Sequence, residues 1–269
     1  MPLAVCATPI GNLDDVTLRV LEQLRTADVV LCEDTRHTRV LLDRHGIAAT
    51  RLLSYHEHNE AKRTAEVLPR LEAGETVALV SDAGLPGISD PGARLVGAAL
   101  DAGVAVTVLP GASAVETALV ASGLTAERYQ FVGFLPRGAK ALRAFWAELA
   151  AWAYPVVAFE SPQRLAATLQ SLADADADRE VAVCRELTKK FEEVVRGRAV
   201  DVASQFSAAP KGEITLVIGP GRGSEPAETD DAVAAVAELV GAGVPRRQAA
   251  DVVARLTGVS RNELYRRTL

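Results

Sequence analysis

The sequence predicts an α/β protein with parallel or mixed sheets, followed by a small all-α domain of helix-turn-helix type. Short β-branched and apolar runs alternate with amphipathic segments along most of the 269 residues, which is typical of strands joined by helices. Residues 230–269 show helical periodicity only. The composition, 49% hydrophobic and 24% charged, is that of a globular protein and excludes collagen, coiled coils and wholesale disorder.

Strands are expected where short apolar runs stand between turn residues. The expected strands are residues 3–8, 29–33, 77–81, 105–109, 129–134, 156–160, 181–185 and 213–218. The segment 182–198 is expected to hold two strands joined by a charged connection. Amphipathic helices are expected over 17–27, 58–74 and 92–103, and the last two reach a glycine that can stop a helix in the left-handed conformation.

Two stretches divide the chain into domains. The turn LPGASA (109–114) leads straight into a helical pattern, and it predicts an N-terminal α/β domain over 1–114 and a second α/β domain over 115–221. The run GPGRGSEPAET has no apolar periodicity, so residues 222–229 are expected to be a linker. Three short helical patterns with tight turns then predict a helix-turn-helix-like domain over 230–269.

Basic charge is concentrated at the C-terminal end. The whole chain has 29 Lys and Arg against 35 Asp and Glu, a net charge of −6. Residues 245–269 hold six arginines against two acidic residues, a net charge of +4, so the remaining chain carries −10. This distribution favours a helical module that binds nucleic acid. A small capping or dimerisation bundle with solvated arginines is the alternative.

The start MPLAVCATPIGNL lacks the basic region and long apolar run of a signal peptide, and no apolar run approaches the roughly 18 residues of a membrane span. We therefore expect a cytoplasmic protein. Cys6, Cys32 and Cys184 lie singly inside apolar runs, so buried free thiols are expected. The histidines of YHEHNE (55–60) lack a tetrahedral ligand set, and we expect no metal site.

The turn TPIGNLDDVT (8–17) stands between a predicted strand and a predicted helix, and Gly11 allows close backbone approach there. In open α/β sheets ligands bind outside the carboxyl ends of strands, so this turn is a candidate site. The chain contains neither GxGxxG nor GxxxxGK[ST], which disfavours an NAD enzyme and a P-loop nucleotidase.

The loop CEDTRHT follows the second predicted strand and places Glu33, Asp34 and Arg36 at the same sheet edge. Asp34 is either a candidate catalytic group or only the N-cap of a solvated helix. Both interpretations fit the residues, because a short carboxylate just before a helical pattern serves either role.

The loop SDAGLPGISDPG is shaped by glycine and proline and carries Asp82 and Asp90. These carboxylates can accept hydrogen bonds from a ribose or an ammonium group, which indicates a ligand-binding loop. A plain surface loop is the alternative.

Nine motifs of the chain carry a family resemblance: TPIGNL, EDTR, YHEHNE, SDAGLPGISDPG, LPGASA, FLPR, FESPQRL, CRELTKKFEE and GEITLV. Together, and in this order, they resemble the bacterial 16S ribosomal RNA cytidine 2′-O-methyltransferases of the tetrapyrrole-methylase-like superfamily. The resemblance extends to the small helical C-terminal domain. It departs from the family at Gln163, where a histidine is expected, and after FLPR, where the connection is shorter and less basic.

The resemblance implies a two-domain tetrapyrrole-methylase-like fold that binds S-adenosylmethionine in the cleft between its domains. It also implies a homodimer whose acceptor is a cytidine 2′-hydroxyl in the decoding region of 16S rRNA in the small ribosomal subunit. Two alternatives stay open. One is a precorrin or siroheme carbon-methyltransferase on the same fold, against which the tail and the EDTR loop argue. The other is a nonenzymatic, ligand-sensing regulator that binds nucleic acid.

Carried over by position, the resemblance places residues from several motifs against the cofactor. Dry apolar walls around a sulfonium and accurate alignment should supply most of the acceleration of methyl transfer. The implied cofactor-binding residues are Pro9, Ile10, Asp82, Gly84, Leu85, Ser113, Ala114, Ser161 and Ile214.

A ribose hydroxyl is a poor nucleophile while protonated, so an acceptor for its proton should accelerate the reaction by roughly 10² to 10⁴. The candidate bases are Asp34, Glu33 and Glu160, with Lys189 a fourth if burial lowers its pKa. Arginines are expected to hold phosphates as charge-assisted donors. The predicted RNA-binding residues are Arg36, Arg137, Arg185, Arg246, Arg247 and Arg261.

Overall fold

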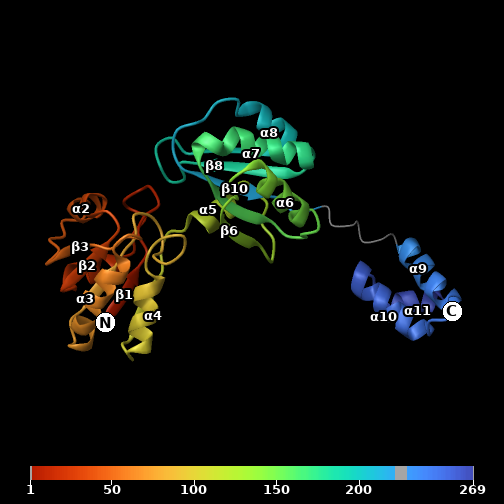
Figure 1. Cartoon of the computed structure of the whole chain (residues 1–269). Coiled ribbons are helices and arrows are strands. Elements are labelled where there is room, and N and C mark those ends of the chain that lie inside the picture. The colour runs from red at the N-terminus through yellow and green to blue at the C-terminus, as the bar shows by residue number, and fades with distance from the viewer. Residues whose placement is uncertain (1, 222–228, 269) are drawn as a thin grey trace.

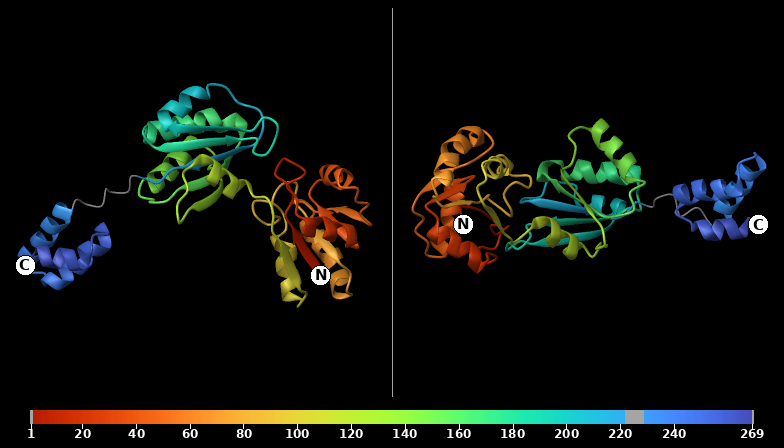
Figure 2. Two further views of the ribbon diagram at one scale, coloured as in Figure 1. Left: turned by 180° about the vertical axis from the view of Figure 1, so that it is seen from behind. Right: turned by 90° about the horizontal axis from the view of Figure 1, so that it is seen from below.

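The computed structural model describes residues 2–221 and 229–268, which form two α/β halves and a group of three helices. Figure 1 shows the first half in red to yellow, the second in yellow-green to light blue, and the three C-terminal helices in darker blue. In both views of Figure 2 the two α/β halves lie next to each other. The predicted linker 222–229 lies outside the described residues except for Thr229.

The first half is built on a parallel sheet of five strands in the order β3-β2-β4-β1-β5. The sequence does not predict β3, because this edge strand is only three residues long and half-buried and so lacks an apolar run. The other strands lie where they are expected, but β1, β2 and β4 end one or two residues earlier and β5 begins one residue later. The five strands are β1 (Leu3–Cys6), β2 (Val29–Cys32), β3 (Leu52–Ser54), β4 (Val77–Leu79) and β5 (Val106–Leu109).

Helices cover both faces of the first sheet. Successive strand residues point to opposite faces, so Ala4 and Cys6 pack with α1 and α2, whereas Leu3 and Val5 pack with α3 and α4. The apolar runs that predict these strands are therefore buried on both sides. The helices are α1 (Leu18–Thr26), α2 (Thr35–Arg44), α3 (Glu60–Glu72) and α4 (Ala93–Asp101).

The second half is built on a mixed sheet in the order β6-β7-β10-β8-β9. Only β6 and β7 pair in parallel, and the other three pairings are antiparallel. β8 and β9 are the two strands expected within 182–198. The strands are β6 (Gln130–Phe134), β7 (Val156–Glu160), β8 (Glu180–Arg185), β9 (Glu193–Arg198) and β10 (Ile214–Ile218).

Four helices belong to the second half. α5 covers one face of the sheet, where Val115 and Ala118 pack with Val157. The other three helices cover the opposite face, where Trp146 and Leu165 belong to one core. The predicted boundary between residues 114 and 115 falls in the first turn of α5. The helices are α5 (Ala114–Ser122), α6 (Ala139–Leu149), α7 (Pro162–Ala175) and α8 (Ala199–Gln205).

The last three helices have a small core of their own. It is formed by residues of these helices alone, among them Ala232, Val236, Ala249, Val253 and Leu264. The prediction of an all-α C-terminal part is therefore confirmed. The helices are α9 (Thr229–Gly241), α10 (Arg246–Thr257) and α11 (Arg261–Arg267).

The three cysteines are buried free thiols, as the sequence predicts. Among residues 2–221 and 229–268, no helix combines the length and the apolar character needed to cross a membrane.

Candidate active site

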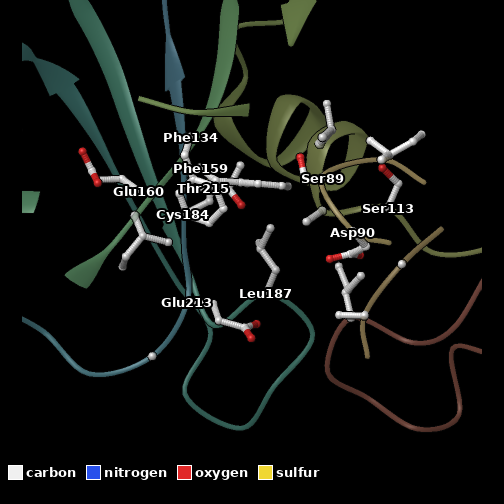
Figure 3. Close-up of a pocket in the computed structure, with 18 of the residues that line it drawn as sticks. Ser89, Asp90, Ser113, Phe134, Phe159, Glu160, Cys184, Leu187, Glu213 and Thr215 are labelled. Carbon is white, nitrogen blue, oxygen red and sulfur yellow. The ribbon is translucent and has the colours of Figure 1, made fainter. Parts of the chain in front are cut away.

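A cavity of about 390 Å³ lies between the two α/β halves. One wall is the loop after β4 together with the start of α5. The other wall is the edge of the second sheet where β7 and β8 end and β10 begins. Figure 3 shows side chains from both walls around the same space. We call this cavity the cleft.

Strand direction explains why these segments meet. All strands of the first sheet are parallel, so the loops after β1, β4 and β5 lie at one edge. In the second sheet β10 runs antiparallel to β7 and β8, and Ile214 pairs with both Glu160 and Arg185. The start of β10 therefore lies beside the ends of β7 and β8, although the three segments are far apart in sequence.

Most of the predicted cofactor residues line the cleft, and they come from both walls. Pro9 and Asp82 lie instead beside a smaller hollow at the β1–α1 turn, together with Gly11 and His37. Asp82 is held there by the backbone N–H of Asp34, which donates to its carboxylate at 3.1 Å. The predicted residues in the cleft itself are Ile10, Gly84, Leu85, Ser113, Ala114, Ser161 and Ile214.

The second sheet adds apolar residues that the sequence analysis does not assign to the cofactor site. Phe134 and Phe159 stand edge to face with ring centroids 5.6 Å apart, and Cys184 and Leu187 also line the cleft. Burial raises the pKa of the Cys184 thiol to about 12. These residues lie within one or two residues of the ends of β6, β7 and β8. They could have been predicted only from the pairing of these strands, which brings their ends together.

Glu160 lines the cleft, but its carboxylate is already fully used. The side chain has no exposed surface and accepts hydrogen bonds from the Ser161 N–H at 2.7 Å, Thr168 Oγ1 at 2.6 Å and Arg164 Nη2 at 3.0 Å. Figure 3 shows it directed away from Asp90. This network joins the end of β7 to the first turns of α7, which is a structural role.

Lys189 does not have the lowered pKa that a basic role requires. Its Nζ donates to Glu186 at 2.9 Å and to Glu213 at 2.8 Å. Burial lowers the pKa of Lys189, but the bonds to Glu213 and Glu186 outweigh this and raise the pKa above its ordinary value. The side chain therefore stays protonated at neutral pH. Lys189 was a candidate base only if burial lowers its pKa, and its pKa is raised instead.

Asp34 is the N-cap of α2, as the alternative interpretation of the EDTR loop predicts. Its carboxylate accepts from the Arg36 backbone N–H at 2.8 Å and from the Arg36 guanidinium at 2.6 Å. The bonds to the Arg36 side chain and backbone hold the pKa of Asp34 well below its usual range. A carboxylate so stabilised is a weak proton acceptor. For Glu33, burial and the nearby charge of Asp82 raise the pKa.

Asp90, in the loop after β4, is the carboxylate that the first wall contributes to the cleft. Burial raises its pKa to about 6, repulsion from Glu33 and Asp82 adds to the rise, and the Ser81 hydroxyl opposes it. The preceding residue, Ser89, has a φ of +64°, a left-handed conformation that is uncommon outside glycine. The chain thus holds a carboxylate in an unfavourable environment at the mouth of the cleft.

This environment predicts that Asp90→Asn makes the protein more stable at neutral pH. The raised folded-state pKa means that the ionised carboxylate destabilises the fold fully above about pH 6, and that this effect disappears below about pH 4, where the group is protonated in both states. Because Asp90 is partly exposed, we expect a gain of about 1–2 kcal/mol at pH 8. Urea unfolding at pH 8 and pH 4 checks it, and an equal effect at both pH values contradicts it.

The loop between β8 and β9 lies across the β1–α1 turn of the first half. Thr188 Oγ1 accepts from the Asn12 backbone N–H at 2.9 Å. A Cβ at Gly11 would stand 2.8 Å from the Leu187 carbonyl oxygen, so only glycine fits beneath this loop. As predicted, Gly11 allows another segment to approach its backbone closely, and that segment is residues 187–189 of the same chain. We call residues 186–192 the clasp.

The predicted RNA-binding arginines differ in their surroundings. Arg36 pairs with Asp34, and Arg261 pairs with Asp251 at 2.5 Å. Arg185 donates to Glu193 at 2.9 Å and to the Lys211 carbonyl at 3.1 Å. It therefore connects the end of β8 to β9 and to the segment before β10. In contrast, Arg137 and Arg247 are exposed, and Arg246 is half-buried at the start of α10.

Two family profiles cover most of the chain. Residues 2–203 match tetrapyrrole (corrin/porphyrin) methylases, and residues 226–269 match the RsmI C-terminal HTH domain. Solved structures agree on the fold. A uroporphyrin-III C-methyltransferase from Thermus thermophilus, in a crystal with S-adenosyl homocysteine, aligns with a TM-score of 0.56 at 19% identity over 80% of this chain and 96% of its own. A conserved hypothetical protein from Aeropyrum pernix aligns with a TM-score of 0.63 at 20% identity, over 99% and 94%.

Sequence relatives are much more similar. The ribosomal RNA small subunit methyltransferase I of Mesorhizobium japonicum is 45% identical over 99% of this chain and 91% of its own length. That of Mycobacterium bovis is 46% identical over 98% and 93%. The predicted tetrapyrrole-methylase-like fold and the family resemblance are both confirmed. The chain belongs to the tetrapyrrole methylases and, within them, to the ribosomal RNA small subunit methyltransferase I family.

Proposed function

We propose that this protein transfers a methyl group from S-adenosylmethionine to the ribose 2′-hydroxyl of a cytidine in 16S rRNA of the small ribosomal subunit. The observation that carries the proposal is identity of 41–46% with ribosomal RNA small subunit methyltransferases I over almost the whole chain. A uroporphyrin-III C-methyltransferase and a cobalt precorrin-4 methyltransferase of known structure are 23% and 20% identical to this chain, so they support the fold and not a tetrapyrrole acceptor.

The cleft fits this cofactor in size and in chemistry. Its volume of about 390 Å³ is within the range of roughly 300–1,000 Å³ for small-molecule sites. When bound, S-adenosylmethionine supplies an electrophilic methyl group on a positively charged sulfur. Ile10, Leu85 and Leu187 would exclude water around that charge, while Ser113 and Ser161 offer polar groups at the starts of α5 and α7.

The C-terminal helices and the predicted arginines of the body, which are Arg36, Arg137 and Arg185, would bind the RNA. Arg137 and Arg247 are exposed, whereas Arg36 and Arg261 would first have to leave their ion pairs. Phosphate contacts of this kind position an RNA without reading its sequence. Binding to ribosomal RNA would place the activity in the cytoplasm.

We expect Arg247→Ala to weaken RNA binding by removing one phosphate contact. The slope of log K against log salt should become shallower by about 1, with little change in the rate of methyl transfer at saturating RNA. Fluorescence anisotropy with a labelled rRNA fragment at several salt concentrations measures this. The control is Arg19→Ala on α1, which removes an equally exposed arginine from the body. Equal effects of the two variants contradict the prediction.

A homodimer is part of the proposal. The edge strand β5 exposes half of Val108 in the first half, and α5 leaves Val120 71% exposed in the second, so both halves present apolar side chains that a second copy could cover. Sedimentation of the whole chain at several concentrations tests the dimer. A monomer at all concentrations removes this part of the proposal and leaves the reaction unaffected.

The experiment that tests the function uses labelled S-adenosylmethionine and small ribosomal subunits from a strain that lacks the endogenous modification. Digestion of the rRNA should release the label as 2′-O-methylcytidine. Tight cofactor binding without any labelled RNA would favour a tetrapyrrole or another small acceptor. If neither cofactor binding nor turnover is found, a nucleic-acid-binding regulator becomes the better explanation.

A further inference from the structure

The proposed reaction needs a group that takes a proton from the ribose hydroxyl, and three of the four predicted candidates are occupied. The fourth, Glu33, is not among the residues that line the cleft. Asp34 is held by Arg36, and Lys189 is an ammonium group between two carboxylates. Glu160 has no exposed surface and already accepts from three donors. A further carboxylate of the cleft, Glu213, is 73% exposed and bonded to Lys189.

Asp90 differs from these groups in position. It lines the cleft from the first wall, and Figure 3 shows it pointing toward Leu187 of the second wall. The residues just before it reach the second half, because Ser89 Oγ lies 3.9 Å from where a Cβ of Gly133 in β6 would be. Ile88, beside it at the mouth, is 51% exposed. An acceptor entering the cleft from solvent therefore meets Asp90.

The charged groups that act on Asp90 are all acidic. They are Glu33 at the end of β2, Asp82 after β4 and Glu213 before β10, while the Ser81 hydroxyl is the stabilising neighbour. Burial and these charges raise the pKa of Asp90 to about 6. At pH 7 the group is mostly ionised and yet more basic than an ordinary aspartate, which suits a general base.

We propose that Asp90 is the catalytic base of the reaction, accepting the proton of the ribose 2′-hydroxyl as methyl transfer proceeds. The inference rests on the proposed function. The hydroxyl oxygen forms a bond to the methyl carbon, the carbon–sulfur bond breaks with its electron pair going to sulfur, and the hydroxyl proton passes to a carboxylate oxygen of Asp90. One positive and one negative charge disappear in the same step, which an apolar cleft favours.

The test compares the wild type with Asp90→Asn, which keeps the size of the side chain and removes the basic oxygen. Single-turnover methylation of small ribosomal subunits is measured at saturating S-adenosylmethionine between about pH 5 and pH 8. The wild-type rate should rise with pH and then level off, with a midpoint at or below about 6 because the sulfonium charge stabilises the carboxylate. Asp90→Asn should be slower by about 10² to 10⁴ at pH 7.5 and should lose this rise.

The matched control is Asp101→Asn at the exposed end of α4, which changes the net charge equally and should keep the wild-type rate and profile. Calorimetry with S-adenosylmethionine should give the same affinity for the wild type and Asp101→Asn, and an affinity only a few fold lower for Asp90→Asn, because the carboxylate and the sulfonium attract each other. The inference is overturned if Asp90→Asn methylates within a few fold of the wild type, if it slows but keeps the wild-type pH profile, or if it loses only cofactor affinity. Failure of the wild type to methylate RNA overturns the proposed function itself.

Discussion

Replacing Glu160 with alanine should lower the free energy of unfolding by about 3–5 kcal/mol. The carboxylate has no exposed surface, and its removal leaves the Thr168 hydroxyl without its acceptor. It also removes the charged partner of the Arg164 guanidinium, which then keeps only the carbonyls of Leu135 and Pro136. Thr168 is 3% exposed, so water cannot easily take the place of the carboxylate. Urea unfolding of the whole chain, followed by circular dichroism, measures the effect.

The matched control for this loss is Glu148→Ala on α6, an exposed glutamate whose removal should change stability by no more than about 0.5 kcal/mol. Equal stability of the two variants would show that the Glu160 network does not hold the end of β7 to α7. Glu160→Gln separates structure from catalysis, because it keeps the volume of the side chain. We expect it to unfold more easily than the wild type and still to transfer methyl groups.

Replacing Gly11 with alanine should weaken binding of S-adenosylmethionine by about 10- to 100-fold. The new methyl group would lie 2.8 Å from the Leu187 carbonyl oxygen and would also clash with Lys189 Cγ, so the clasp must move. The φ of Gly11 is not among the positive ones, which means that alanine is not strained by its own backbone. Overpacking of this kind costs about 1–3 kcal/mol. The free protein avoids this cost by moving the clasp, but the cofactor site needs Leu187 in the wall, so the cost falls on the bound state. About 1.4 kcal/mol corresponds to a tenfold change in affinity.

Calorimetry with the cofactor measures this loss, and Gly97→Ala is the control. Gly97 lies within α4, and no atom stands within 4 Å of its added Cβ, so its substitution should leave the affinity unchanged. If Gly11→Ala binds the cofactor as tightly as Gly97→Ala, the clasp does not support the cleft. Methylation rates at saturating cofactor should be less affected than affinity, because the proposed base, Asp90, belongs to the opposite wall of the cleft.

The fold was largely predictable because its strands are marked locally. Buried runs such as residues 29–33 carry apolar side chains for both faces of the sheet, and a short pattern is enough to find them. β3 escaped prediction because a half-buried edge strand of three residues carries no such pattern. The all-helical end was equally clear from its periodicity.

The site was predictable mainly where it is built from loops that follow strands. Ile10 and Leu85 lie in such loops and line the cleft as expected. Leu187 and Phe159 enter it because β10 pairs with β7 and β8, and no local pattern reports that pairing. The roles of ionisable groups were hardest to predict, since the partners of Lys189 lie up to 24 residues away and decide its charge.

Cys184 gives the cleft a further property. Only a thiolate is an effective nucleophile, and a pKa of about 12 leaves a thiolate fraction of ~10⁻⁵ at pH 7. With the proposed cofactor bound, a reactive sulfur in the wall would compete with the RNA for the methyl group and would inactivate the enzyme through self-alkylation. Burial keeps this thiol un-ionised and therefore a weak nucleophile. Cys184 can then line the cleft without being methylated, and the methyl group goes to the incoming substrate.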